Sequence, residues 1–162
     1  MRIDYENGYY EGEVNNKNQK HGFGKFVYNV GDVYVGQFEN DLRHGFGKIT
    51  LSFGDFYVGE WKDNYKNGYG KYTYHDGDVY LGEFFDDQKH GNGKYVSADG
   101  DVYDGQWKGG RKCGHGIMKY ADGGVYNGEW DFNERSGHGV MTYPDGTVYD
   151  GEWEDDEEVT EE

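Results

Sequence analysis

The sequence predicts an all-β protein: an elongated, single-layer, twisted antiparallel sheet of tandem β-hairpins. A Tyr-x-Gly-x-aromatic motif recurs every 23 residues from Tyr34 to Tyr149, and Tyr10 precedes Tyr34 by 24 residues. A second motif, typified by HGNGK at 90–94, lies between successive copies of the first. Residues alternate with a period of two inside both motifs, which is typical of strands. A fixed period of about 20–50 residues indicates an array of small supersecondary units.

Each repeat is expected to form one hairpin and to join the next through a tight turn. In residues 79–96 the strands are 79–84 and 91–96, joined by the polar segment FDDQKH. Asp-Gly pairs supply the left-handed backbone that tight turns need; they occur in YHDGD (74–78), SADGD (97–101), YADGG (120–124) and YPDGT (143–147).

Three segments are expected along the chain. Residues 1–9 form a leading strand or cap, and residues 10–153 form six full repeats of 23–24 residues and a half repeat. The remaining residues, 154–162, are nearly all acidic, and a run of like charges indicates a disordered tail.

One face of the predicted sheet, called face A, carries the motif tyrosines, the glycines and a second aromatic residue four positions later. A glycine inside a strand indicates close approach of another group, so we expect each ring to lie over glycines of neighbouring strands. The chain is 34% hydrophobic and 19% aromatic, so rings must supply most of the burial. The expected aromatic ladder is Tyr34, Phe38, Tyr57, Trp61, Tyr80, Phe84, Tyr103, Trp107, Tyr126, Trp130, Tyr149 and Trp153.

The opposite face, called face B, changes its chemistry along the chain. After each motif tyrosine the residues run Val35, Val58, Leu81, then Asp104, Asn127, Asp150. At the middle of Gly-x-Gly they run Phe23, Phe46, Tyr69, then Asn92, His115, His138. An exposed apolar strip with a polar rim usually marks an interaction site. We therefore predict a partner-binding groove on Phe23, Val35, Phe46, Val58, Tyr69 and Leu81.

The alternative is that these apolar residues pack under an internal cover or are merely exposed. On the same face, a Glu or Gln recurs at Gln37, Glu60, Glu83, Gln106, Glu129 and Glu152. We expect these residues to oppose lysines across strands, in pairs worth about 0.2–1 kcal/mol each. The lysines are Lys25, Lys48, Lys71 and Lys94.

Charge and composition exclude several classes of function. The net charge is −16; residues 1–80 hold 12 acids and 9 bases, and residues 81–162 hold 20 acids and 7 bases. Such a chain should repel nucleic acid and anionic lipid. It has neither a membrane-length apolar run nor a signal peptide. The lone Cys113 excludes an internal disulfide and fits a reducing compartment, so a cytoplasmic location is expected.

Neither a catalytic, a cofactor nor a metal site is predicted. His21, His44 and His90 occupy equivalent positions about 10 Å apart, too far for a shared zinc ion, and are interpreted as turn residues. The Asp-Gly-Asp turns at 76–78 and 99–101 lack the rest of a calcium loop. No acid, base and nucleophile recur together, so an enzyme is not expected.

The repeated Tyr-x-Gly-x-Trp and His-Gly-x-Gly pattern over residues 10–153 closely resembles the MORN (membrane occupation and recognition nexus) repeat. Departures are Val14 at an aromatic position and Cys113 and Ser136 at histidine positions, which suggest a capping first repeat and altered turns. The resemblance implies a non-catalytic module. Arrays of this family, as in ciliary radial spokes and cytoskeletal scaffolds, bind a partner peptide or self-associate.

The predicted function is a protein–protein interaction scaffold, cytoplasmic and associated with the cytoskeleton or a cilium. Its partner would be an amphipathic helix or an extended peptide with a basic flank. A homodimer is a further expectation, because a terminal hairpin leaves an unpaired edge. The alternatives are a phosphoinositide- or membrane-binding module, which would need clustered Lys and Arg, and an accessory repeat domain of a larger enzyme.

Overall fold

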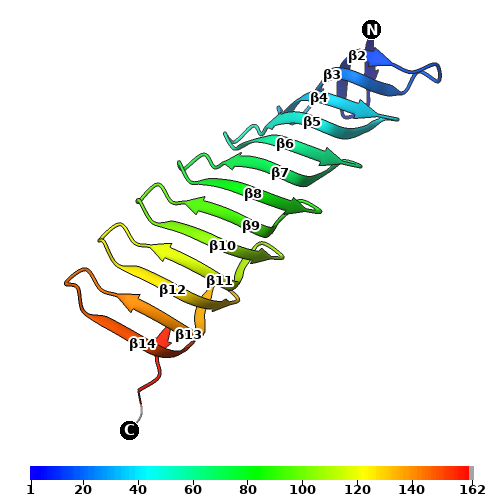
Figure 1. The fold of residues 1–162 in the computed structure, drawn as a ribbon. Coiled ribbons are helices and arrows are strands. Elements are labelled where there is room, and N and C mark those ends of the chain that lie inside the picture. Colours follow the sequence, from blue (N-terminus) through cyan, green and yellow to red (C-terminus); the bar gives the residue numbers. More distant parts are fainter. Residues whose placement is uncertain (161–162) are drawn as a thin grey trace. The chain divides into compact units, whose positions relative to one another are not determined.

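The structure, a computed structural model, describes residues 1–160 as fifteen β-strands joined by turns (Figure 1). Within this range no residue lies in a helix, and it therefore contains no helix that could span a membrane. The hydrogen-bonded order of the strands is their order in the chain, and paired strands run antiparallel. The predicted all-β fold of tandem hairpins is confirmed.

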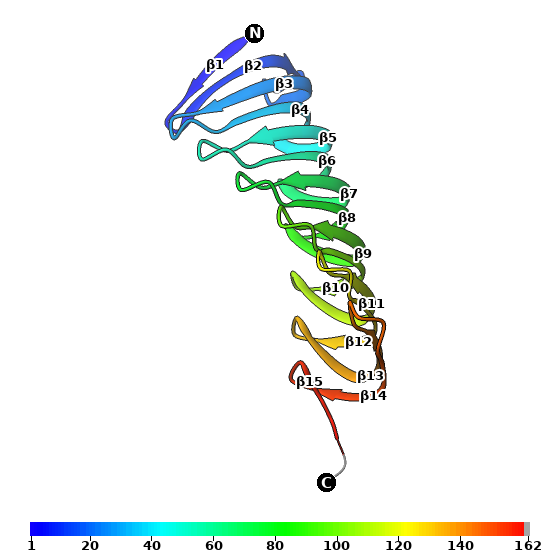
Figure 2. The ribbon, with the colours of Figure 1, turned by 90° about the vertical axis from the view of Figure 1, so that its left-hand side faces the viewer.

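The chain divides into two compact units, residues 1–77 with 84–87, and residues 78–83 with 88–162. The strands of the first unit are β1 (Arg2–Tyr5), β2 (Gly8–Val14), β3 (Lys20–Tyr28), β4 (Val33–Glu39), β5 (Leu42–Thr50), β6 (Phe56–Lys62) and β7 (Tyr65–Thr73). Those of the second are β8 (Val79–Phe85, of which 79–83 belong to this unit), β9 (Gln88–Val96), β10 (Val102–Lys108), β11 (Arg111–Lys119), β12 (Val125–Asp131), β13 (Glu134–Thr142), β14 (Val148–Glu154) and β15 (Glu157–Glu158). In Figure 2, β1 lies beside β2 and β15 beside β14.

Two kinds of tight turn join the strands. Inside the hairpins, pairs such as Asp86–Asp87 have φ values of 45° and 69°. Positive φ at both residues is the mark of the type I′ turn, which Asn, Asp and Gly favour. The other pairs of this kind are Asn40–Asp41, Asp63–Asn64, Gly109–Gly110, Phe132–Asn133 and Asp155–Asp156. Between hairpins, the predicted left-handed glycine is confirmed at Gly77, whose φ is 99° and whose N–H donates to the Tyr74 carbonyl at 3.0 Å.

Face A is the core, and its chemistry repeats in every hairpin. In the first unit the Tyr57 ring lies over Gly70, where a Cβ atom would come within 2.5 Å of Tyr57 Cζ. The Tyr57 hydroxyl donates to the Glu60 carbonyl at 2.8 Å, and Trp61 packs edge-on against Tyr57 at 5.2 Å between ring centroids. The expectation that rings cover glycines is confirmed.

The second unit repeats this arrangement with the same geometry. Tyr126 covers Gly139 and donates to the Glu129 carbonyl at 2.8 Å. Trp130 packs edge-on against Tyr126 at 5.2 Å and donates to the Gly116 carbonyl at 3.1 Å. The residues of the predicted aromatic ladder are buried in both units, except Tyr149, which is partly exposed.

The first glycine of each Gly-x-Gly leaves the strand alternation that we expected of it. Gly45 and Gly91 have φ values of 74° and 58°, and the hairpin register shifts beside Gly45. The Gln37 side chain fills the space over Gly45 and accepts from the Phe46 N–H at 2.6 Å. The predicted pairing of Glu and Gln with Lys is therefore wrong. Gln37 lies opposite Phe23 instead of a lysine, and its side chain bonds to the backbone of the irregular segment on β5.

The acidic segment after Trp153 is also different from the prediction over residues 154–158. Glu154 ends β14, and β15 pairs with it across the Asp155–Asp156 turn. The Asp156 carboxylate accepts from the backbone and the guanidinium of Arg135 at 2.7 and 3.1 Å, which fixes this turn despite the like charges around it. Residues 161–162 of the predicted tail lie outside the described residues.

Candidate functional site

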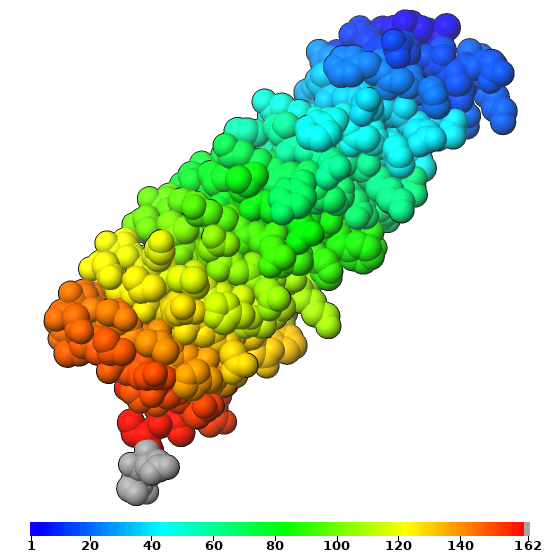
Figure 3. Space-filling model, in the orientation of Figure 1, coloured from blue at the N-terminus to red at the C-terminus, as the bar shows by residue number. Residues whose placement is uncertain are grey.

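The candidate site predicted on face B lies mainly on β3–β7 of the first unit. Five of its residues belong to this unit, and their side chains are 38–59% exposed. They are Phe23, Val35, Phe46, Val58 and Tyr69, named below the first-unit strip. The sixth residue, Leu81, is 53% exposed and belongs to the second unit. Figure 3 shows the surface that the consecutive hairpins of each unit present.

Lysines alternate with the valines of the first-unit strip. Val35 lies opposite Lys25 on β3 and opposite Lys48 on β5. Val58 lies between Lys48 and Lys71 in the same way. Side chains opposite each other on one face of a sheet are in contact distance. The strip therefore offers apolar surface and positive charge side by side. We had not expected this combination, because the predicted Lys–Glu pairing would have neutralised the lysines.

The backbone of the aromatic residues in the strip is fixed by hydrogen bonds to side chains of neighbouring strands. The N–H of Phe23 donates to Glu13 Oε2 at 2.8 Å, and that of Tyr69 donates to the Glu60 carboxylate. A hollow of about 430 Å³ opens beside Phe46, between Gln37 and Glu60. Charge-assisted bonds to backbone N–H groups are among the stronger hydrogen bonds, so these rings are presented from a fixed backbone.

Face B of the second unit is polar at the corresponding positions. His138 Nε2 lies 3.0 Å from Asp150 Oδ1, and its Nδ1 lies 3.4 Å from Glu152 Oε1. His115 Nε2 lies 2.8 Å from Asn127 Oδ1. These polar side chains bond to each other at the positions where the first unit has its exposed Phe, Tyr and Val residues.

Face A also carries a column of cations that was not predicted from the sequence. Its members recur every 23 residues, and this period was the signal that could have found them. They are Lys20, Arg43, Lys66, Lys89, Lys112 and Arg135. Their charged groups lie over aromatic rings of face A: Arg43 Cζ is 4.6 Å from the Trp61 centroid, and Lys112 Nζ is 4.7 Å from that of Trp130.

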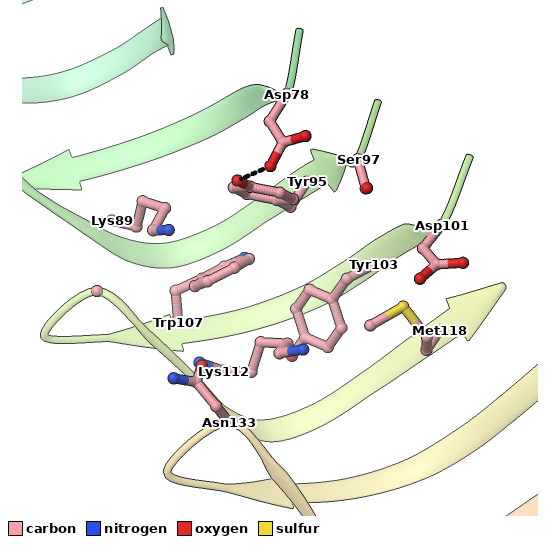
Figure 4. A pocket seen from close by; sticks show the side chains of 11 residues that line it. Asp78, Lys89, Tyr95, Ser97, Asp101, Tyr103, Trp107, Lys112, Met118 and Asn133 are labelled. Atoms are coloured by element: carbon pink, nitrogen blue, oxygen red, sulfur yellow. Dashed lines mark hydrogen bonds between the residues drawn. The ribbon is translucent and has the colours of Figure 1, made fainter. Parts of the chain in front are cut away.

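The second unit holds a cavity of about 340 Å³ within this column (Figure 4). Lys89 and Lys112 lie on one side of it, and Asp78 and Asp101 on the other. Burial lowers the pKa of both lysines, and for Lys89 the charge of Lys112 lowers it further while Asp78 opposes the change. Asp78 accepts a hydrogen bond from the Tyr95 hydroxyl, which holds the pKa of that carboxyl below its usual value.

The histidines of the HGxGK motifs lie in strands, so the turn interpretation was wrong. His21, His44 and His90 belong to β3, β5 and β9, because the hairpin turns end before them, at residues 19, 41 and 87. His44 Nε2 lies 3.1 Å from Glu39 Oε2. Within residues 1–160, no group of three His, Cys, Asp or Glu side chains could hold a metal ion.

Comparison with known proteins gives a family match and several similar structures. A model of the MORN repeat matches residues 10–33, 34–55, 57–79, 80–102, 103–125 and 126–148. The comparison with curated proteins gives no match. Among solved structures, the TCP domain of Drosophila melanogaster SAS-4 (dCPAP), in complex with a proline-rich motif of Ana2 (dSTIL), is 12% identical, with a TM-score of 0.53 over 92% of this chain and 81% of that chain.

The TCP10 domain of Danio rerio CPAP, in complex with a peptide of Danio rerio STIL, is 14% identical over 94% of this chain and 83% of that chain, with a TM-score of 0.45. At such identities the similarity to the SAS-4 domain concerns the fold alone.

Proposed function

Since this chain belongs to the MORN repeat family, we propose that it is a non-catalytic scaffold whose first unit binds a protein partner on face B. The observation that carries the proposal is the first-unit strip. Phe23, Phe46 and Tyr69 are each 58–59% exposed on a face that needs no aromatic residue for folding, because the core lies on face A. Exposed apolar surface of this kind is typical of an interaction site.

The partner segment is an extended peptide or an amphipathic helix with apolar anchors for the strip. Such segments dock with regularly spaced side chains. Lys25, Lys48 and Lys71 alternate with the two valines, so polar or acidic groups of the partner fit between its anchors. A basic flank of the partner, predicted from the acidic residues 81–162, remains a prediction.

The SAS-4 domain supports a peptide as the occupant. It shares only the fold with this chain, and it was solved with a proline-rich motif of Ana2. Fold similarity is an analogy and not a functional assignment. From the lone Cys113 and the family membership we further propose a cytoplasmic location in association with the cytoskeleton or a cilium.

The test selects peptides from a random displayed library on the wild-type chain and measures their binding to two double variants. In the first variant, Phe46→Asp and Val58→Asp place charges in the strip. The control, His115→Asp with Asn127→Asp, changes the same two repeat positions three repeats later. We expect the first variant to lose at least about tenfold in affinity, as truncated anchors commonly do, and the control to bind like the wild type.

Folding is followed by circular dichroism and thermal unfolding, since both variants should melt close to the wild type if the strip is not core. Normal binding by a folded Phe46→Asp, Val58→Asp variant would remove the strip from the interface. Pelleting with phosphoinositide-containing vesicles, lost in the same variant, would favour the membrane-binding alternative instead.

A further inference from the structure

The hairpin turns of the chain supply a side-chain oxygen to the cation column. The second turn residue accepts from the backbone N–H of the basic residue 21 positions earlier. Asp87 Oδ1 accepts from the Lys66 N–H at 2.8 Å and lies 3.8 Å from Lys66 Nζ. Asp41 does the same for Lys20, at 2.9 and 3.5 Å. The other turns follow this rule with Asn64, Asn133 and Asp156.

One turn breaks the rule. Gly110 is the second residue of its turn and stands where the acceptor of Lys89 would be. A Cβ atom built at Gly110 would meet nothing within 4 Å, so the space for a side chain is open. The turn itself does not demand glycine, because Asp87 adopts φ 69° where Gly110 adopts 78°. Among the two-residue hairpin turns of residues 1–160 with positive φ at both residues, this one alone therefore lacks the side-chain acceptor.

The cavity of the second unit lies at this gap. Gly110 lines it together with Lys89, Lys112 and Trp107 (Figure 4). Lys89 Nζ lies 4.6 Å from the Trp107 ring centroid, which restrains the side chain on the wall of the cavity. Among residues 1–160, neither Lys89 nor Lys112 makes an ion pair, whereas Lys20, Lys66 and Arg135 do.

The acidic groups of the cavity already have donors. Asp78 accepts from the Tyr95 hydroxyl and from the Ala98 N–H, the latter at 2.8 Å. Asp101 accepts from the Ala121 N–H at 2.8 Å. In Figure 4 Asp78 is bonded to Tyr95, and Tyr103 lies between Asp101 and Lys112. Two cations and two anions leave the cavity without net charge, which suits a singly charged ligand better than a phosphate dianion.

We propose that this cavity binds a carboxylate of a protein partner, which occupies the place that the Asp87 and Asp41 side chains take in their own hairpins. The carboxylate accepts from Lys89 Nζ and Lys112 Nζ and lies over the Trp107 ring edge at the Gly110 gap. Hydrogen bonds between charged groups contribute more than neutral ones. The source is an Asp or Glu side chain or a chain terminus. The site is on face A of the second unit, so it stands or falls independently of the first-unit strip.

The experiment titrates the full chain with N-acetylaspartate amide, N-acetylglycine and inorganic phosphate, and follows amide NMR signals at constant ionic strength with chloride. We expect saturable shifts at Lys89, Gly110 and Lys112 with a carboxylate probe. Lys20 and Lys66, which have their own aspartates, serve as internal controls and should not shift. A preference for the first probe indicates a side-chain carboxylate, and a preference for the second a chain terminus.

Two variants make the test specific. Gly110→Asp should supply the missing carboxylate from within the chain and abolish the saturable shifts. Lys89→Met keeps the apolar contact with Trp107 and should weaken binding by about tenfold or more. Equal shifts with chloride, tighter binding of phosphate, or an unchanged response of Gly110→Asp would overturn the proposal.

Discussion

The two units of the chain have the same buried face and different outer faces. On face A, Tyr57 of the first unit and Tyr126 of the second make the same hydrogen bond at the same distance of 2.8 Å. On face B, Phe46 is 58% exposed in the first unit, whereas His115 at the same repeat position is bonded to Asn127. The fold constrains face A at every repeat and leaves face B free. The proposed binding site therefore lies where the repeats differ.

The Gly109–Gly110 turn is a place on face A where one repeat differs from the others. Lys66 and Lys89 stand at equivalent positions, but only Lys66 has an aspartate across the turn, Asp87. Glycine at position 110 therefore leaves Lys89, on the wall of the cavity, without the turn carboxylate that Lys66 has. The repeat acts as an internal reference, against which each departure can be measured.

The largest expected effect tests whether face A is equivalent in the two units. We expect Gly70→Ala in the first unit and Gly139→Ala in the second each to cost about 2–3 kcal/mol in the free energy of unfolding. In both, the added methyl group would lie within 2.5 Å of Tyr57 Cζ or Tyr126 Cζ. Urea unfolding followed by tryptophan fluorescence gives the two values. If one glycine tolerated alanine and the other did not, the buried faces would not be equivalent.

A smaller effect concerns the acidic residues that join consecutive hairpins in both units. Burial alone would raise the pKa of Asp55, but hydrogen bonds from the Tyr72 hydroxyl and from His75 outweigh it and lower the pKa. The pKa of Asp78 is lowered by the Tyr95 hydroxyl and the Ala98 N–H. Because both are lower than in the unfolded chain, the folded chain binds fewer protons, and stability should fall as the pH drops below about 4.

Unfolding midpoints between about pH 5 and pH 3 measure this dependence. Asp55→Asn and Asp78→Asn should each flatten the curve and cost about 1.5–3 kcal/mol at neutral pH. A steep acid dependence that survives in the double variant would assign the effect to other carboxylates.

The smallest effect, of opposite sign, distinguishes the turns of the two units. Phe132 adopts φ 46°, where the matching residues of the first unit are Asn40 and Asp63. A bulky residue in the left-handed region is strained. Its ring is 67% exposed and contacts Arg111, whose Cζ lies 5.0 Å from the ring centroid. We expect Phe132→Asn to raise the free energy of unfolding by about 0.5–1 kcal/mol, seen as a higher thermal midpoint. A lower midpoint would mean that the Arg111 contact outweighs the strain.

Face A could be predicted well from the sequence, because aromatic rings and glycines on one sheet face can pack in few ways. A tyrosine and a glycine on facing strands at a fixed period can bury a ring in one way only. It could not predict the irregular segment, since Gly91 and Gly93 are the same residue and differ only in backbone conformation, with φ of 58° at Gly91. The partners of Gln37 and Glu60 follow from that conformation.

The acidic end and the cation column show a second limit. Charge alone indicated disorder after Trp153, but Asp156 reaches back 21 positions to Arg135. Lysine and arginine side chains are long, so the aromatic rings and carboxylates that they contact can come from residues far away in the sequence. The periodicity of Lys20, Arg43 and Lys66 is visible in the sequence, and only the turn geometry shows what it serves.

The central claim is that the two units differ in what face B binds. Amide NMR of the full chain, titrated with a library-selected peptide, tests it most directly. The signals of Phe23, Phe46 and Tyr69 should shift or broaden with saturation, and those of His115 and His138 should stay in place. Saturable shifts confined to His115 and His138, with the first-unit strip unchanged, would contradict it.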